Sequence, residues 1–372
     1  MRTLSIDHIE FYVGDAIAMT QSLCSVYGFR VCGRGRPETG LPGQRSVLLG
    51  QGAIRIVLTS GLHEDHPASQ FVARHGDGVA VIGFRADVAA AYADAVAAGA
   101  TSVSQPRSWE NGGARVVTAQ IEGFGEVVYR LVERHGPDDE FLPGPIVMEP
   151  GAADAAADAA AADDAAGDLL TRIDHVALCV PAGELDPTVA FHERVLGFTV
   201  IFQEYVEVGA QGMLSKVVQS PSGGATFTII EPDQSRQPGQ LDDFLAWHGG
   251  AGVQHLAFLT HDIVQAVRTF GERGAGFAVT PSAYYDMLGA RFGPTEIPAE
   301  DLRPLGILVD RDHWGQMYQI FAKSTHIRRT YFHELIERRG ARTFGMSNIP
   351  ALYAAKDREL AEIRAMTGTT HA

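Results

Sequence analysis

The chain repeats its own pattern, and this repetition limits the folds that are open to it. Residues 6–9 read IDHI, and residues 173–176 read IDHV. Each of these short alternating runs is typical of a β-strand. Residues 26–29 (VYGF) and 195–198 (VLGF) then match each other, and a glycine at this point is typical of the end of a helix. The chain therefore contains two copies of at least one strand–helix unit.

Two further pairs extend the repeat towards the end of each half. Residues 76–81 (GDGVAV) match 250–255 (GAGVQH), and 129–134 (YRLVER) match 333–338 (HELIER). Each half thus holds two modules of a strand, a helix and further strands, which predicts four βαβββ modules of the α+β class. We expect the strands of each half to curl into an open barrel around a cavity, with a helical tail from about residue 349 to 366.

An acidic, alanine-rich stretch separates the halves. Residues 148–168 contain six Asp and Glu, no basic residue and no aromatic or β-branched residue. Such a composition cannot build a packed core and predicts a linker. We therefore expect an N-terminal domain over residues 1–146, a linker over 147–170 and a C-terminal catalytic domain over 171–372.

Composition narrows the classes of partner. The chain of 372 residues carries a formal net charge of −15, which argues against a nucleic-acid ligand. Its three cysteines form no CxxC pair, the first residues do not resemble a signal peptide, and no apolar run is long enough to cross a membrane. We expect a soluble cytoplasmic protein that forms a homodimer. One basic cluster is interpreted as a solvent-exposed face: Arg328, Arg329, Arg338, Arg339 and Arg342.

The repeat also allows the two halves to be compared position by position. The matched pairs are His175 with His8, His255 with Val81, and Glu334 with Arg130. Only the second half has two imidazoles and a carboxylate on three separate module strands. Two His and one carboxylate are the ligands of non-haem iron(II) oxygenases. Spacing alone leaves open that these histidines are structural, as His8 must be.

The remaining histidines are weaker candidates as ligands. Those in loops or on helices are expected at the surface: His63, His66, His75, His192 and His261. His248 and His313 each adjoin a tryptophan, which favours a packing role.

The second half resembles the 4-hydroxyphenylpyruvate dioxygenase family, which has the vicinal oxygen chelate fold. The matching runs are 172–176 (RIDHV), 252–257 (GVQHLA), 319–321 (QIF) and 332–336 (FHELI), followed by Phe344-Gly345 and Asn348. In that family the two His and the Glu of these runs bind iron. The resemblance therefore implies an Fe(II) site formed by His175, His255 and Glu334. The first half matches more loosely but in the same order.

Within the family the chain resembles the 4-hydroxymandelate synthase branch. Ile230 stands where the homogentisate-forming enzymes have an asparagine, and Ile349 stands where they have a phenylalanine. Residues 215–220 and 283–286 also resemble the synthase branch. Both changes should alter how an aromatic ring sits against the oxidant, and placement decides which atom reacts. The resemblance implies oxidative decarboxylation of 4-hydroxyphenylpyruvate with O2 and benzylic hydroxylation to 4-hydroxymandelate.

The same resemblance suggests residues for the substrate pocket. Expected substrate contacts are Ser215, Thr228, Ile230, Gln319, Phe321, Phe332, Phe344, Asn348 and Ile349. Gln240 and Gln254 are weaker candidates that would orient the ligands rather than touch the substrate. His333 replaces the usual phenylalanine of the family and, by strand alternation, should point away from the iron.

Several alternatives stay open at this point. Three other enzyme functions fit the same residues: a dioxygenase that forms homogentisate, an oxygenase for another 2-oxo acid, and a zinc or nickel lyase. A binding or resistance protein without a metal is a further alternative from another class, against which the intact ligand set argues.

Overall fold

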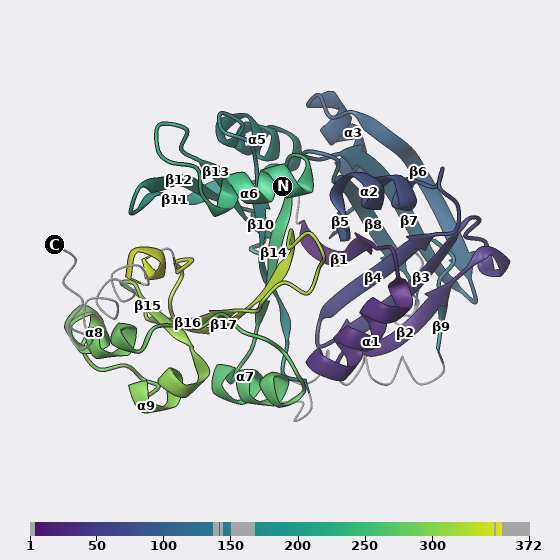
Figure 1. Ribbon diagram of the computed structural model, residues 1–372. Coiled ribbons are helices and arrows are strands. Elements are labelled where there is room, and N and C mark those ends of the chain that lie inside the picture. Colours follow the sequence, from purple (N-terminus) through teal and green to yellow (C-terminus); the bar gives the residue numbers. More distant parts are fainter. Residues whose placement is uncertain (1–3, 137–140, 142–143, 150–167, 346, 352–372) are drawn as a thin grey trace.

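The computed structural model describes residues 4–136, 141, 144–149, 168–345 and 347–351. Two curled, mixed β-sheets with flanking helices stand side by side, one from each half of the chain (Figure 1). The predicted α+β class and the four modules in two curled sheets are confirmed. Most of the predicted linker and of the helical tail lies outside the described residues, so the domain boundaries remain a prediction. Among the described residues, no helix is long and apolar enough to cross a bilayer.

The first half follows the predicted order of elements. Its elements are β1 (Ser5–Tyr12), α1 (Ala16–Tyr27), β2 (Arg30–Gly35), β3 (Gln44–Gln51), β4 (Ile54–Gly61), α2 (Pro67–His75), β5 (Gly78–Arg85), α3 (Val88–Ala97), β6 (Ser102–Asn111), β7 (Ala114–Glu122), β8 (Val128–His135) and β9 (Val147–Met148). Helix α1 begins where the Asp15 side chain accepts hydrogen bonds from two backbone amides, and it ends at Gly28 in the left-handed conformation. Local sequence signals therefore fix both ends of this helix.

The second half repeats this order and adds helices. Its elements are β10 (Arg172–Cys179), α5 (Leu185–Phe191), the π-helical turn η2 (His192–Leu196), β11 (Thr199–Val208), β12 (Gln211–Gln219), β13 (Thr226–Pro232), α6 (Gln240–His248), β14 (Gly252–Leu259), α7 (Ile263–Glu272), α8 (Ser282–Phe292), α9 (Ala299–Leu302), β15 (Leu308–Arg311), β16 (Gln316–Phe321) and β17 (Phe332–Arg339). Helices α8 and α9 are inserted between α7 and β15, so the fourth module is longer than the simple βαβββ pattern.

The two sheets have the same strand order when one of them is followed in the opposite direction, apart from the additional edge strand β9. The first sheet runs β6-β7-β8-β5-β1-β4-β3-β2-β9, and the second runs β11-β12-β13-β10-β14-β17-β16-β15. In each sheet the first strands of the two modules pair antiparallel, β1 with β5 and β10 with β14. Each of these strands also pairs in parallel with the last strand of its own module. The centre of each sheet is therefore built from the strands that carry the repeated motifs.

Helices and the outer, convex faces of both sheets share one hydrophobic core. Aromatic rings meet across the boundary between the halves: Phe84 lies 5.9 Å from Phe227, and Phe29 lies 6.1 Å from Phe258. The inner, concave faces carry separate, smaller clusters. Since the convex faces are used for packing, the concave faces are left to hold sites.

Two histidines differ from the expectation that they lie at the surface. His192 is completely buried, and its Nε2 accepts a hydrogen bond of 2.6 Å from the Tyr129 hydroxyl of the other half. His75 is buried as well, and its ring stacks on that of His248 at 4.5 Å. Both expectations were wrong because each helix face is covered by the opposite half, which local sequence does not reveal.

Candidate metal centre and substrate pocket

His175, His255 and Glu334 converge on the concave face of the second sheet. They lie on the neighbouring strands β10, β14 and β17, where Ala257 is in register with both His175 and Glu334. The Glu334 Oε2 atom lies 3.4 Å from His175 Nε2 and 3.3 Å from His255 Nε2. Adjacent ligands that are each about 2.1 Å from one metal lie about 3 Å apart. The three residues are buried, and one ligand atom from each lies within 4.8 Å of the others.

Two β-bulges explain how the residue before each histidine can orient it. Neighbouring residues of a regular strand point to opposite faces. The register shifts at Asp174 and again at Gln254, so each is an extra residue in its strand. The Asp174 carboxylate lies 2.9 Å from His175 Nδ1, and Gln254 Oε1 lies 3.1 Å from His255 Nδ1. Both Nε2 atoms are thereby left for a ligand.

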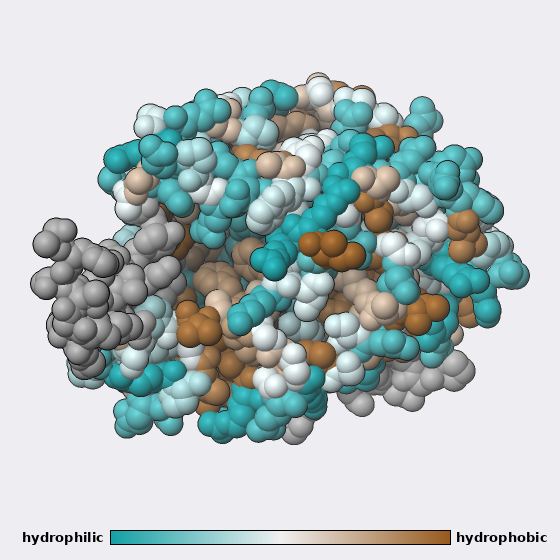
Figure 2. Space-filling view, viewed as in Figure 1, coloured by the Kyte–Doolittle hydropathy of each residue, from teal (hydrophilic) through white to brown (hydrophobic). Residues whose placement is uncertain are grey.

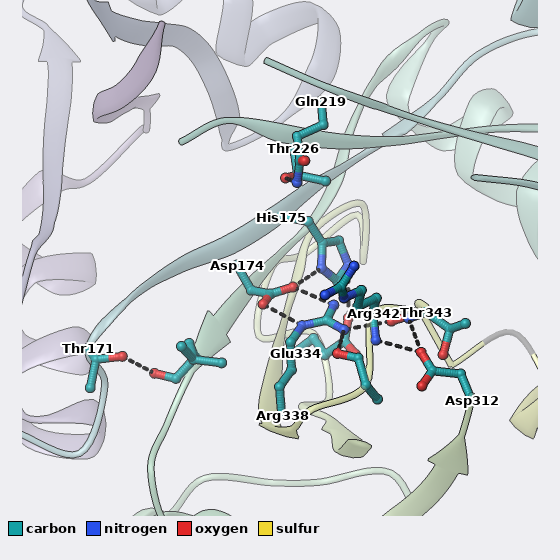
Figure 3. Close-up of polar contacts among 12 residues, drawn as sticks. Thr171, Asp174, His175, Gln219, Thr226, Asp312, Glu334, Arg338, Arg342 and Thr343 are labelled. Atoms are coloured by element: carbon teal, nitrogen blue, oxygen red, sulfur yellow. Dashed lines mark hydrogen bonds and ion pairs between the residues drawn. The ribbon is translucent and has the colours of Figure 1, made fainter. Parts of the chain in front are cut away.

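Arg338 completes the support of the first histidine. Its guanidinium donates two hydrogen bonds to Asp174, at 2.7 and 2.8 Å, and others to the carbonyls of Ala341 and Thr343 (Figure 3). These bonds and the Arg338 charge hold the pKa of Asp174 well below its usual range despite burial. Sequence reasoning missed both residues, because Arg338 stands in the basic cluster that was interpreted as exposed. The repeat carried the missing signal, since Asp7 and Arg134 occupy the same positions in the first half.

The charges at the centre suit a divalent cation. Burial opposes ionisation of Glu334, but hydrogen bonds with both imidazoles lower its pKa, so it remains a carboxylate. Burial likewise opposes protonation of His175, yet its bonds with Asp174 and Glu334 raise its pKa to about 9. The pKa of His255 is lowered, mainly by burial. In the absence of metal a proton therefore balances the carboxylates, and a metal ion would displace it.

The four polar residues predicted for the substrate pocket share one property. Each is buried and has a side-chain atom without a hydrogen-bond partner among the described residues: Ser215 Oγ, Thr228 Oγ1, Gln319 Oε1 and Asn348 Nδ2. Buried polar atoms nearly always have a partner in protein, water or ligand. Ser215 and Thr228 lie on β12 and β13, and Gln319 lies on β16. In the sheet, these strands flank the three strands of the triad, β10, β14 and β17, on either side.

The three predicted phenylalanines lie around the imidazoles. The ring of Phe332 stacks on His255 at 4.8 Å, and Phe321 stands edge-on to Phe332 at 5.9 Å. Phe344 meets His175 edge-on at 5.3 Å. They form apolar walls on opposite sides of the triad, which would exclude water from a bound substrate. Figure 2 shows apolar residues in the recess of this half, between the strands β11 to β13 and the part that contains α8 and α9.

Ile230 and Ile349 belong to one apolar cluster beside this pocket. Ile230 is 6% exposed, is in register with both Cys179 and Ser215, and packs in a cluster that Ile349 also contacts. The two isoleucines predicted to steer the ring are therefore brought together. Gln240, by contrast, is exposed in the first turn of α6, and no hydrogen bond joins it to the triad among the described residues.

The segment that follows β17 is held in place by two tethers. Gln319 Nε2 donates a hydrogen bond of 3.4 Å to the backbone carbonyl of Gly345, a residue that has a φ of 70°. A Cβ atom at residue 345 would lie 2.0 Å from Gln319 Oε1, so both conformation and space require glycine there. The Tyr284 hydroxyl donates a hydrogen bond of 2.7 Å to Asn348 Oδ1. Asn348 is therefore fixed from outside the pocket, with only its Nδ2 atom lacking a partner.

His333 points away from the triad, as strand alternation predicts. It lies on the convex face, where its ring contacts Tyr27 at 4.9 Å and Tyr331 at 5.1 Å. Burial lowers its pKa to about 3, so the imidazole is neutral.

The matching positions of the first half hold a built-in cation. Arg130 donates hydrogen bonds of 2.7 Å to Glu10 and 3.0 Å to His8 Nε2. Asp7 lies 2.8 Å from His8 Nδ1 and accepts hydrogen bonds from Arg134. Phe141 meets His8 edge-on at 5.2 Å, as Phe344 meets His175. The support around the first histidine is therefore duplicated, while the ligand set is not.

Comparisons with known proteins agree with this geometry. The sequence profile of the Glyoxalase/Bleomycin resistance protein/Dioxygenase superfamily matches residues 172–318, and a second profile of that superfamily matches residues 7–118. The duplicated fold and its buried His-His-Glu centre thus define a dioxygenase-type member of this superfamily. The chain belongs to the 4-hydroxyphenylpyruvate dioxygenase family and is an enzyme of the oxidoreductase class.

Relatives match over nearly the whole chain. A probable 4-hydroxyphenylpyruvate dioxygenase 2 of Aspergillus fumigatus is 33% identical over 96% of this chain and 94% of its own length. The 4-hydroxyphenylpyruvate dioxygenase of Xenopus tropicalis is 30% identical over 95% of this chain and 91% of its own length. The structure of a triple mutant of 4-hydroxymandelate synthase from Streptomyces coelicolor is 39% identical, with a TM-score of 0.84 over 97% of this chain and all of that one.

Proposed function

We propose that the chain binds iron(II) through His175, His255 and Glu334 and forms 4-hydroxymandelate. The substrates are 4-hydroxyphenylpyruvate and O2, and the second product is CO2, so both oxygen atoms of O2 enter products. The buried donor set fits the ion, because two neutral imidazoles and one carboxylate hold iron(II) and cancel only part of its charge. Bound iron supplies the redox chemistry that activates dioxygen for oxidative decarboxylation and hydroxylation.

The chain's own residues would bind and orient the 2-oxo acid. The unpartnered atoms of Ser215, Gln319 and Asn348 offer hydrogen bonds to its polar groups. Phe332 and Phe344 would pack against the aromatic ring and keep water out of the pocket. Because the three polar side chains are buried and the two rings are packed against the imidazoles, they restrict the poses that the substrate's ring can adopt.

The choice of product is carried by one observation: Ile230, in the apolar cluster that Ile349 contacts, is in register with Ser215. An asparagine there would bring two donors and an acceptor into the pocket. With isoleucine the substrate's ring has no such partner. We infer that the benzylic carbon of the substrate, rather than its ring, is presented to the oxidant. The 39% identity to a 4-hydroxymandelate synthase supports the same choice.

The test is aerobic turnover of 4-hydroxyphenylpyruvate by the iron(II)-loaded protein, with products identified by chromatography and mass. We expect 4-hydroxymandelate from the wild type and some homogentisate from Ile230→Asn. The matched control Ile230→Val keeps the site apolar and should keep the product. Homogentisate from the wild type would retain the iron site but reject the argument from Ile230. Absence of iron-dependent oxygen uptake would reject the substrate as well.

A further inference from the structure

A second cavity lies between the halves, outside the concave pocket. It measures about 260 Å³ and is formed by α1 of the first half and by the connection from β16 to β17. Four aromatic residues line its buried part: Tyr27, Tyr331, Phe332 and His333. Drug-sized pockets measure roughly 300–1,000 Å³, so this cavity suits a molecule with a single ring.

The connection that forms the cavity is fixed against the first half. His326 Nδ1 lies 3.2 Å from the carbonyl oxygen of Asp77, and Arg328 donates hydrogen bonds to backbone carbonyls of α2, including that of Ala73 at 2.9 Å. The cavity is therefore bounded on both sides by segments that are held in place.

The buried part contains polar atoms without a partner. Among the described residues, nothing accepts from or donates to the Tyr331 hydroxyl or His333 Nε2. Tyr331 is 1% exposed and His333 is 9% exposed. Since native proteins rarely leave buried polar atoms unpaired, a ligand or ordered water is the expected partner.

The internal repeat shows what this region would look like without a ligand. By the repeat, His333 corresponds to Tyr129, and Leu23 on α1 corresponds to His192. At the other interface, the Tyr129 hydroxyl and His192 Nε2 close the contact with a hydrogen bond of 2.6 Å. Leu23 has no polar atom to offer His333, and the cavity lies at this contact. His333 therefore lacks the polar partner that His192 supplies to Tyr129, and a polar group of a ligand would fit at this position.

The outer part of the cavity offers both signs of charge. Lys323 lines this outer part and is exposed. Asp15 and Asp77 use one carboxylate oxygen for backbone amides, of Ile17, Ala18 and Gly14, which leaves the other oxygen of each for a ligand. A carboxylate and an ammonium on one molecule would satisfy this arrangement better than either group alone.

We propose that this cavity binds a hydroxylated aromatic α-amino acid. The ring of the ligand fills the cavity beside these aromatic side chains, its hydroxyl lies towards Tyr331 and His333, and its ammonium and carboxylate groups face the two aspartates and Lys323. This binding site is independent of the reaction proposed above. Phe332 lines the cavity and also stacks on His255 at 4.8 Å, so a bound amino acid contacts the wall of the metal centre.

The test is isothermal titration of the full-length, iron-loaded protein with L-tyrosine, L-phenylalanine, tyramine and 4-hydroxyphenylacetate. We expect one L-tyrosine per chain, bound about threefold to tenfold more tightly than L-phenylalanine because of one additional hydrogen bond. Tyramine lacks the carboxylate and 4-hydroxyphenylacetate lacks the ammonium, so both should bind more weakly than L-tyrosine.

Three variants locate the site. His333→Phe keeps the shape and should abolish the preference for L-tyrosine over L-phenylalanine. Ser22→Trp fills the cavity from α1 and should abolish binding. Gln319→Ala changes the concave pocket and should leave L-tyrosine binding unchanged. The proposal is overturned if L-tyrosine does not bind, if Gln319→Ala but not Ser22→Trp abolishes binding, or if L-tyrosine and L-phenylalanine bind equally well, since the polar atoms would then be paired by water.

Discussion

The two halves of the molecule support a histidine in the same way and then place different groups in front of it. Asp7 and Asp174 both lie in a β-bulge next to the histidine that they orient, and each is paired with an arginine from the last strand of the second module of its half, β8 or β17. In the second half the other imidazole nitrogen faces the Glu334 carboxylate. In the first half it faces the Arg130 guanidinium.

In the absence of a metal ion, this difference gives two similarly supported imidazoles opposite pKa shifts. Burial lowers the pKa of both, but hydrogen bonds with Asp174 and Glu334 raise the pKa of His175 to about 9. For His8 the bond with Asp7 does not outweigh burial and the Arg130 charge, so its pKa is lowered. The comparison teaches that one scaffold holds either a fixed side-chain cation or an anionic centre that requires a mobile cation. The halves differ at two of the three matched positions, where Val81 and Arg130 of the first half replace His255 and Glu334 of the second.

The largest expected effect tests the second half. Glu334→Gln removes the only carboxylate of the triad, so kcat should fall at least about a thousandfold, or about 4 kcal/mol in transition-state free energy. Iron content should fall with it. Glu337→Gln is the matched control, because Glu337 is equally buried on the same strand but accepts a hydrogen bond from the Ile263 amide. Comparable losses in the two variants would show that Glu334 is structural.

The next contrast tests the first half. Arg130→Met leaves the Glu10 carboxylate buried without its cation, which typically costs about 3–5 kcal/mol of stability. Urea denaturation at neutral pH measures the loss, and iron bound per folded chain should be unchanged. Arg45→Met, at an exposed position on β3, serves as the control and should have little effect. Loss of iron from folded Arg130→Met would contradict the assignment of iron binding to the second half alone.

A paired substitution sharpens the comparison at the shared aspartates. Asp174→Asn should weaken metal binding about 10- to 100-fold, which is typical when the partner of a ligating histidine is removed. Asp7→Asn should leave metal affinity unchanged, although each variant costs stability by leaving Arg338 or Arg134 with a weaker partner. Metal titration of both variants decides the matter, and equal affinities would contradict the assignment.

The smallest effect concerns the interface that Tyr129 and His192 close. Burial lowers the pKa of His192 to about 4. The unfolded chain therefore binds this proton more readily, and stability that is present above about pH 6.5 is lost as pH falls towards 4. By pH 5 this group should cost roughly 2 kcal/mol. The double variant His192→Leu with Tyr129→Phe should lose that part of the acid sensitivity in urea titrations at pH 7 and pH 5. An unchanged pH profile would assign the sensitivity to other groups.

Much of the fold and the centre could be predicted because the repeat compares the chain with itself. The modules follow from matched strand and helix ends such as Gly28 and Gly197, and the triad follows from positions where only one half has metal-binding residues. Long-range packing could not be predicted. Arg338 appears in sequence as one of a row of surface charges, and His192 appears as an exposed residue of a helix. Helices α8 and α9 have no counterpart in the first half, so the repeat gives no signal for them.

The shared core has a consequence for how such a chain can evolve. The first half has an arginine at the position where the second half has the Glu334 carboxylate, yet the first half cannot be discarded. Phe227 and Phe258 of the second half are buried partly against Phe84 and Phe29 of the first. A chain reduced to the second half would expose these rings to water and aggregate. The duplicate without a site thus persists as an obligatory lining for the other, and selection on it acts through solubility rather than through catalysis.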